Sequence, residues 1–555
     1  MASHDKTQAT SLDVVVIGAG FAGLYALYRF REDGFSTRAY EEGENVGGVW
    51  YWSRYPGARC DSESIYYNYT FSDELLQEWT WSSRYPEQPE ILSYLNYMAD
   101  KFDLRQDIQF KTRVTAAHFD NEHNRWQIYL NDDTSISAKY LITGVGCLSA
   151  TNIPDFKGLD SFEGEWYHTG NWPHEKVKFD GKRVGVIGTG SSGVQSIPVI
   201  AQEASHLTVF QRTPQYAVPA RNHAYDPNFI RQTKENYNEI KRKMYNSWGA
   251  LPFVPHNRSA LEDTPEERRK VYEDAWQKGG EGFAAATYND LLFSEESNET
   301  ASEFIRNKIR ETVHDPEVAE KLLPTHYYAT KRPILDTYYY ETYNRDNVTL
   351  LDVKKDPVEE VTPSGVRTAE AEYDLDILVF ATGYDGMTGP LFKIDIHGED
   401  GTTLKEKWKD GAETRTYLGM TTAGFPNFFM ITGPESPSVL ANVPTAIEQH
   451  VNWIANCIQY LSDHEIEKIE AKEEAEEAWS EHCNEVAQAT LFPKTESWYT
   501  GANIAGKPSG RFPIYLAGFP IYRQKCNEVA ANGYEGFWMY KKEMRNIEKN
   551  HVTTE

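Results

Sequence analysis

The chain has 555 residues, a formal net charge of −27 and a hydrophobic content of 40%. This length allows two or three domains with a large core, and the acidic balance argues against nucleic acid or anionic membranes as partners. No apolar run approaches the about 20 residues of a membrane-spanning helix, and residues 1–11 lack an apolar signal core. We therefore expect a frayed N-terminal tail and a soluble, cytoplasmic protein without a membrane partner.

A glycine-rich phosphate-binding fingerprint follows the first apolar run. Residues 14–17 predict a strand, and the GxGxxG pattern of residues 18–23 predicts a tight turn that opens a helix whose amides face a pyrophosphate. Glu41 lies 18 residues after this pattern, at the end of the next apolar stretch, where a carboxylate can bond a ribose diol. The residues of the pattern that we expect at this cofactor are Gly18, Gly20, Phe21 and Gly23.

Residues 47–61 are dense in aromatic residues, glycine and arginine and have no helical or strand periodicity. Such a segment is typical of a loop bound to a flat ligand, although the same composition suits an aromatic loop in the core. The candidate cofactor contacts in it are Gly48, Trp50 and Tyr55.

A second fingerprint, residues 188–193, follows the apolar run 184–187. Arg212 lies 19 residues further on, at the end of the next strand-like run, where a guanidinium suits a 2′-phosphate. The first pattern with Glu41 therefore predicts a dinucleotide with an unphosphorylated ribose, and the second with Arg212 predicts NADPH. Two such sites in one chain imply a flavoprotein that is reduced by a nicotinamide cofactor. The expected contacts of the second pattern are Gly188, Gly190, Ser191, Ser192 and Gly193.

The remaining patterns predict an α/β fold with two Rossmann-like dinucleotide-binding domains, both discontinuous. Residues 264–269 carry a helix-start signal, residues 302–323 predict one or two further helices, and strand character returns at 348–351 and 375–380. The expected division is an FAD-binding domain of residues 1–147 and 385–540, an NADP-binding domain of 148–220 and 331–384, a helical insertion of 221–330 and a charged tail of 541–555.

The five cysteines are scattered, without a CxxC or CxxxxC pair. This excludes a cysteine zinc site and the redox-active disulfide of flavin disulfide reductases, and it favours free buried thiols in a reducing compartment. We expect no metal site.

Residues 162–173 form the pattern FxGxxxHxxxWP directly before the second fingerprint. This pattern resembles the signature of type I Baeyer–Villiger monooxygenases, and GGxWxxxxYPGxxxD in residues 47–61 resembles their second signature. The resemblance covers nearly the whole chain. It implies a monomeric enzyme that binds FAD and NADPH/NADP⁺ and uses O2 to convert hydrophobic cyclic, aromatic or aliphatic ketones to esters or lactones through a C4a-peroxyflavin.

The resemblance also implies residue roles. Arg332 corresponds to an arginine beside the flavin and nicotinamide, and Asp61 to the carboxylate that holds it. An arginine stays protonated at any working pH, so it can favour a peroxide anion and stabilise the oxyanion of the adduct. Lys331 joins Arg212 and Thr213 around the 2′-phosphate.

Further roles follow from the same resemblance. Trp498 lies on a loop, residues 497–508, that folds over the nicotinamide and lines the active site. The ketone pocket is bordered by Ser438, Val439 and Leu440. His168 lies in the linker between the domains, where we expect it to tie backbone segments together and not to transfer protons.

Two other functions fit part of the sequence. A flavin-containing or N-hydroxylating monooxygenase acting on amines or sulfides is the nearer one, and the tryptophan-proline ending of the linker signature and the Lys331-Arg332 pair argue against it. The other is an NADPH–flavin electron-transfer protein that passes electrons to a partner.

Overall fold

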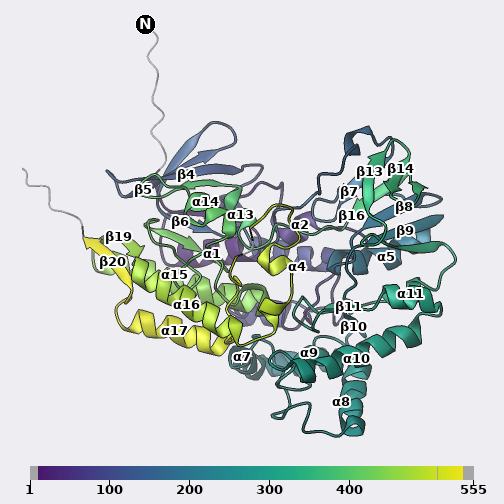
Figure 1. Cartoon of the computed structure of the whole chain (residues 1–555). Coiled ribbons are helices and arrows are strands. Elements are labelled where there is room, and N and C mark those ends of the chain that lie inside the picture. Colours follow the sequence, from purple (N-terminus) through teal and green to yellow (C-terminus); the bar gives the residue numbers. More distant parts are fainter. Residues whose placement is uncertain (1–10, 509, 542–555) are drawn as a thin grey trace, which may run out of the picture.

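The computed structural model describes residues 11–508 and 510–541 (Figure 1). Two sheet-based units lie side by side, and a group of helices lies below the second unit in this view. The expected N-terminal tail falls outside the described residues except for Ser11, which begins the first strand. The C-terminal tail was expected to begin at residue 541, but Lys541 is the last residue of the final strand. The other residues of that tail, 542–555, lie outside the described residues.

The first unit is built on an eight-stranded sheet. Its strand order is β17-β4-β5-β6-β1-β2-β3, with β18 paired to β6. The strand β1 is parallel to both β2 and β6, and its residues Val14, Val15 and Val16 are fully buried. The strands are β1 (Ser11–Ile17), β2 (Thr37–Tyr40), β3 (Ile108–Gln109), β4 (Val114–Asp120), β5 (Arg125–Leu130), β6 (Ser135–Thr143), β17 (Asp395–His397) and β18 (Phe428–Met430).

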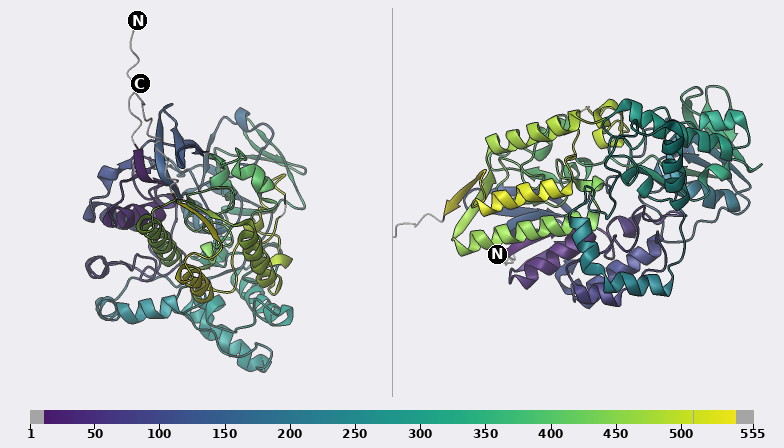
Figure 2. Two further views of the ribbon diagram at one scale, coloured as in Figure 1. Left: turned by 90° about the vertical axis from the view of Figure 1, so that its left-hand side faces the viewer. Right: turned by 90° about the horizontal axis from the view of Figure 1, so that it is seen from below.

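Helices cover this sheet, and Figure 2 shows the C-terminal ones next to α1. The long helix α15 packs against both α1 and α17, and their apolar residues share one core cluster. A two-stranded ribbon, β19 (Ile466–Ala471) and β20 (Phe537–Lys541), closes this end. The helices are α1 (Phe21–Glu32), α2 (Val49–Trp52), α3 (Asp73–Glu78), α4 (Gln88–Lys101), α13 (Gly389–Phe392), α14 (Leu404–Lys407), α15 (Val443–Asp463), α16 (Glu473–Gln488) and α17 (Phe519–Ala531).

The second unit has a parallel five-stranded sheet of order β12-β9-β8-β16-β7, which is a Rossmann-like arrangement. The strands expected at 348–351 and 375–380 are β12 and β16. Its elements are β7 (Glu165–His168), β8 (Arg183–Ile187), α5 (Ser191–Glu203), β9 (His206–Gln211), β10 (Ala217–Pro219), β11 (Ile334–Asp336), α12 (Tyr339–Thr342), β12 (Val348–Asp352), β13 (Val358–Thr362), β14 (Gly365–Thr368), β15 (Glu372–Asp374) and β16 (Ile377–Phe380).

The helical segment after β10 contains six helices between residues 221 and 330. The helix expected after Thr264 is α8, and a capping box between Thr264 and Glu267 starts it. The helices expected at 302–323 are α10 and α11, but α10 begins seven residues earlier because Ser294 caps it. The six are α6 (Pro227–Glu235), α7 (Tyr237–Tyr245), α8 (Pro265–Lys278), α9 (Gly282–Ala285), α10 (Glu295–Thr312) and α11 (Pro316–Lys321).

The chain crosses between the two units twice, and the two crossings lie side by side. Residues 147–152 leave the first unit, and residues 383–387 return to it. Backbone hydrogen bonds of 3.0, 2.8 and 3.1 Å join Asn152 N to Gly383 O, Asp385 N to Ala150 O, and Met387 N to Cys147 O. The two chain crossings are therefore hydrogen-bonded to each other.

Candidate active site

The first glycine turn forms a cradle at the carboxyl end of β1. A Cβ on Gly18 would lie 2.7 Å from the carbonyl oxygen of Gly144, and one on Gly23 would lie 1.8 Å from that of Gly18. No side chain caps the N-terminus of α1, whose N-cap is Gly20. Glu41 directly follows β2 and is buried, and this burial raises the pKa of its carboxyl group. These residues fit a dinucleotide, because free helix amides suit a pyrophosphate and the carboxylate suits a ribose.

The second glycine turn repeats this construction at the end of β8. A Cβ on Gly193 would lie 2.2 Å from the carbonyl oxygen of Gly188, so α5 approaches the turn closely. A Cβ on Gly190 would meet nothing within 4 Å, and no side chain caps α5. The residues therefore fit a second pyrophosphate. Ser191 and Ser192, expected at this cofactor, are the first two residues of α5.

Cationic side chains gather beyond the second turn. Arg212 directly follows β9, and Lys331 lies near enough for the two charges to interact. Burial, Arg212 and Lys354 all lower the pKa of Lys331. Within residues 11–508 and 510–541, neither Arg212 nor Lys331 has a hydrogen-bond or ion-pair partner through its side chain. Thr213 accepts a hydrogen bond from Thr189 through its carbonyl oxygen. Glu496 opposes the lowering of the Lys331 pKa. Like charges that gather without a directly bound carboxylate are what a phosphate site requires.

Lys354 is a cation of this cluster that the sequence did not indicate. It lies two residues after β12, the strand that pairs with β9. Adjacent parallel strands end at the same edge of a sheet, which explains why Lys354 lies at the edge where Arg212 lies and acts on Lys331. A lysine just after the strand expected at 348–351 was the signal that could have found it.

Arg332 and Asp61 form a two-bond ion pair between the two units. The Arg332 Nε donates to Asp61 Oδ2 at 2.8 Å and Nη2 donates to Oδ1 at 2.7 Å. The Nη1 group donates to the carbonyl oxygen of Val439 at 2.6 Å. Asp61 holds the pKa of Arg332 well above its usual value in spite of burial. The guanidinium is therefore a fixed, permanent positive charge.

Glu281 is a second carboxylate near Arg332 that the sequence analysis missed. It precedes α9 in the helical segment, and its Oε1 lies 4.0 Å from Arg332 Nη2. Ser62 donates to this oxygen at 3.4 Å, whereas the buried Oε2 has no hydrogen-bond partner among the described residues. Burial raises the pKa of Glu281 to about 8, an effect that Arg332 opposes and Asp61 reinforces. Glu281 is thus mostly protonated at neutral pH.

An apolar wall lies beside the arginine. Val439 and Leu440 belong to a short helical turn, residues Ser438–Leu440, and pack in one cluster with Trp498. Ser438 is buried with a φ of 39°, a strained backbone that is often held at functional sites. Of the four candidate substrate residues, Val439 contacts Arg332, through its backbone and not its side chain. Ser438 and Leu440 are its neighbours in the chain, and Trp498 packs in the same cluster as Val439 and Leu440.

The loop carrying Trp498 is tied to the returning crossing. A Cβ on Gly386 would lie 2.9 Å from the Trp498 ring. Asn503 Nδ2 donates to the carbonyl oxygen of Tyr384 at 2.8 Å, and Lys507 forms an ion pair with Asp385. The loop and the crossing between the units are therefore joined by direct contacts.

Residues 47–61 lie between the two units. Gly48 has a φ of 53°, and a Cβ on it would lie 2.9 Å from Gly20 Cα, so the segment covers the first glycine turn. The Tyr55 hydroxyl donates to Gln195 of α5 at 2.8 Å, and Trp50 Nε1 donates to the Tyr67 hydroxyl at 3.1 Å. Contrary to the expected loop, residues Val49–Trp52 form one helical turn, α2.

Two expectations concern single side chains. The ring of Phe21, the first residue of α1, packs against Tyr67 and Tyr69 in the core. His168 ends β7 and accepts a hydrogen bond from Gly170 N at 2.9 Å through Nδ1. Burial lowers the pKa of His168 to about 4, so the imidazole is neutral and tied to the backbone.

The thiols agree with the expectation of free cysteines. All five are unpaired, and four of them are buried, while Cys147 is partly exposed. No helix among the described residues is both long and apolar enough to traverse a bilayer.

Comparisons with known proteins identify the class to which this site belongs. A family model for flavin-binding monooxygenase-like proteins matches residues 11–235. The chain is 47% identical to a Baeyer–Villiger monooxygenase from Pseudooceanicola batsensis, over 96% of this chain and 97% of that protein. It is 44% identical to a phenazine N-monooxygenase from Lysobacter antibioticus, over 97% of this chain and 98% of that protein.

A solved structure of an oxidised steroid monooxygenase bound to NADP is 50% identical and covers 96% of this chain and 100% of its own, with a TM-score of 0.91. The protein is thus a flavin monooxygenase that uses FAD and NADPH. Within that class the chain belongs to the Baeyer–Villiger monooxygenases. The family and the two cofactors that the sequence predicted are confirmed.

Proposed function

We propose that this chain inserts oxygen next to the carbonyl of apolar ketones, with Arg332 and Asp61 as its catalytic pair. The observation that carries this assignment is the fixed guanidinium between the two dinucleotide cradles. When bound, the flavin supplies the activated oxygen and NADPH the electrons. The protein supplies a permanent positive charge where negative charge develops on oxygen.

The hydrogen bonds of Arg332 determine how many of its N–H groups remain free for a substrate. A guanidinium has five N–H donors, and Arg332 uses three of them on Asp61 and on the carbonyl oxygen of Val439. Two N–H groups, one on each Nη atom, remain for a reacting oxygen. Asp61 keeps the guanidinium protonated and fixes its plane, so the remaining donors point in set directions.

The surroundings of the pair favour apolar substrates and a dry site. Val439, Leu440 and Trp498 present hydrocarbon surface next to the charged donors. A ketone packed there would have its carbonyl within reach of the arginine and its carbon skeleton away from charge. The loop of Trp498 excludes water, which would otherwise destroy the activated oxygen unproductively.

We propose that Arg212, Thr213, Lys331 and Lys354 bind the 2′-phosphate of NADPH. Support comes from the unpaired cations at the carboxyl ends of β9 and β12. The first cradle has the carboxylate of Glu41 at the equivalent place, which would repel a phosphate and suits the ribose of FAD.

N-oxidation is the second candidate, because a relative of 44% identity is a phenazine N-monooxygenase. The experiment that separates the two supplies the holoenzyme with NADPH, O2 and either a graded panel of ketones or an aromatic amine, and identifies the products by mass spectrometry. Ester or lactone as the main product supports our proposal. N-oxide formed faster than any ester would overturn it.

We also propose that the protein acts as a monomer in the cytoplasm. The five free thiols support a reducing compartment. Light scattering coupled to gel filtration measures the mass directly, and a species of twice the 63.5 kDa chain mass would contradict the monomer.

A further inference from the structure

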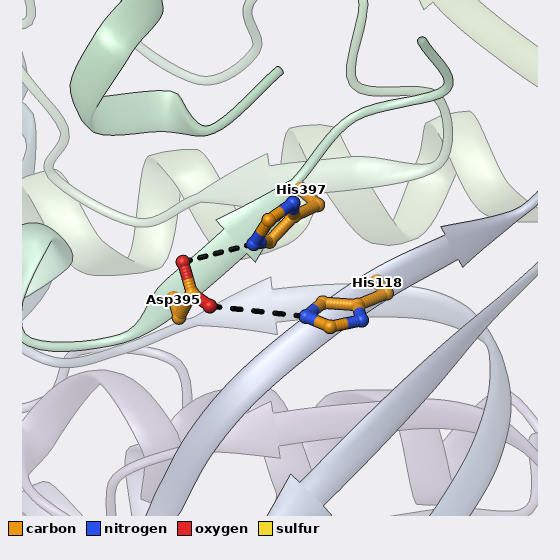
Figure 3. Close-up of side chains that lie close together, drawn as sticks. All are labelled: His118, Asp395 and His397. Atoms are coloured by element: carbon orange, nitrogen blue, oxygen red, sulfur yellow. Dashed lines mark ion pairs between the residues drawn. The ribbon is translucent and has the colours of Figure 1, made fainter. Parts of the chain in front are cut away.

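Three metal-ligating side chains meet at the far edge of the first sheet, away from both glycine turns. The strand β17 is the edge strand and pairs in parallel with β4, with His397 directly opposite His118. Asp395 lies two residues before His397, and side chains two residues apart on a strand share one face. Figure 3 shows the carboxylate of Asp395 beside the two imidazole rings, with one ion-pair contact to each ring.

The distances between the ligand atoms suit one small cation. His397 Nε2 lies 2.9 Å from Asp395 Oδ1, and His118 Nε2 lies 3.9 Å from Asp395 Oδ2. One ligand atom from each residue lies within 4.8 Å of the others. Tetrahedral zinc with bonds of about 2.0–2.1 Å separates its ligands by about 3.3 Å, which falls between the two measured distances.

The orientation of the rings also points to a ligand. His397 Nδ1 lies 3.0 Å from the carbonyl oxygen of Gly401, a contact that turns Nε2 toward Asp395. The buried Nε2 of His118 has no hydrogen-bond partner in the described part of the chain and faces the same carboxylate at 3.9 Å. A cation would bind this free nitrogen and take the place of the proton in the contact between His397 and Asp395.

The charge and the exposure of the site suit such an ion. The carboxylate of Asp395 lies within 3.9 Å of a nitrogen of each imidazole and adds negative charge that attracts a cation. The side chains of His118 and Asp395 are 41% and 59% exposed, which leaves room for a water ligand.

We propose that His118, Asp395 and His397 bind one divalent transition-metal ion of the zinc type. Two imidazoles and one carboxylate with an open position are a common ligand set for such ions. The ion would join the three-residue strand β17 to β4 and so fasten the first strand that the chain forms after its return crossing. The expectation of no metal rested on the scattered cysteines. His118 lies far from Asp395 and His397 in the chain, so no local spacing in the sequence indicates this ligand set.

The test uses the full-length, FAD-loaded protein after treatment with a chelator. Zinc chloride is titrated by calorimetry into the wild type and into His118→Asn, His397→Asn and Asp395→Asn variants. We expect one ion per chain in the wild type and at least a tenfold weaker affinity in each variant. A matched control is His123→Asn, because His123 pairs with Asp120 at 2.8 Å on the same edge without a third ligand.

Two results would overturn the proposal. One is the absence of saturable zinc binding by the wild type, and the other is equal affinity in the wild type and the His118→Asn/His397→Asn double variant. Co²⁺ added to the wild type supplies a reading that does not depend on variant folding. A visible band at wavelengths beyond the flavin absorption supports the nitrogen and oxygen ligands, and its absence contradicts them.

Discussion

The guanidinium of Arg332 and the carboxylate of Asp61, separated by 271 positions in the chain, share two hydrogen bonds of 2.8 and 2.7 Å. Asp61 belongs to the first unit, whereas Arg332 precedes β11 of the second. The pair is thus both the charged centre of the active site and a contact between the units. Any motion of one unit against the other must either carry this pair along or break it.

Arg332→Ala should separate flavin reduction from product formation. The variant keeps both glycine cradles, so NADPH should still bleach the flavin absorbance in anaerobic stopped flow. Ester formation should fall by about 100-fold or more, because a preorganised donor to a developing oxyanion is lost. Arg332→Lys is the matched variant, which keeps the charge but not the planar two-bond geometry. Normal ester yield in Arg332→Ala would remove the basis of the proposed mechanism.

Asp61→Asn tests the pair from the other side. The amide can accept one hydrogen bond but supplies no charge, so the guanidinium is left partly buried without its counter-charge. We expect a loss of about 1–3 kcal/mol in unfolding free energy. A double-mutant cycle with Arg332→Gln measures the coupling. A coupling energy near zero would show that the ion pair has no energetic role.

The cation cluster predicts cofactor preference. Arg212→Gln and Lys354→Ala should each raise the KM for NADPH and leave that for NADH nearly unchanged, because only NADPH carries the 2′-phosphate. Lys355→Ala is the control, since Lys355 is 83% exposed and pairs with Asp352. Steady-state oxidation of both nucleotides measures the ratio. A wild type that prefers NADH to NADPH would contradict the proposed 2′-phosphate site.

Glu281 predicts a pH dependence with a defined sign. Its pKa in the fold is about 8, raised by burial from an ordinary value near 4.5. The folded state therefore holds a proton that the unfolded state releases, so this residue lowers stability as pH rises between about 4.5 and 8. The midpoint temperature of thermal unfolding should fall less steeply with rising pH in Glu281→Gln than in the wild type over this window.

The same residue should affect the reaction. Above pH 8 Glu281 places a second negative charge near Arg332, whereas glutamine at this position does not. We expect the yield of ester per NADPH to decline above pH 8 in the wild type and to stay level in Glu281→Gln. Parallel curves for the two proteins would exclude Glu281 as the titrating group.

The loop of Trp498 should control coupling. Lys507→Met removes the ion pair with Asp385, so the loop should cover the site less completely and admit water. More hydrogen peroxide per NADPH is expected, measured with a peroxidase assay. Lys409→Met is the control, because Lys409 forms only an exposed ion pair with Glu413. Equal peroxide release by both variants would argue against this role of the loop.

The sequence alone predicted those parts of the fold and of the site that depend on local sequence patterns. The glycine turns, the strands before them and the residues at the ends of the following strands carry their own signals, and Glu41 and Arg212 directly follow β2 and β9. Glu281 carries no such signal, because it is one of 83 acidic residues and comes close to Arg332 only through the path of the helical segment.

Other parts of the site depend on contacts that side-chain patterns do not contain. Val439 reaches Arg332 with its backbone oxygen, so the identity of its side chain says nothing about this contact. His118 and His397 become neighbours only when β17 adds to β4. Sheet order and backbone direction decide such contacts, and both are properties of the whole fold.

The interrupted path of the first sheet also has a consequence for biosynthesis. The strand β6 ends at Thr143, whereas its partner β18 begins at Phe428. A ribosome adding about 5–20 residues per second needs roughly 15 to 60 s between them. During that time the emerging flavin cradle exposes an unpaired sheet edge. Slow translation, chaperone holding or early FAD capture would therefore influence the yield of active enzyme more than the final stability of the fold.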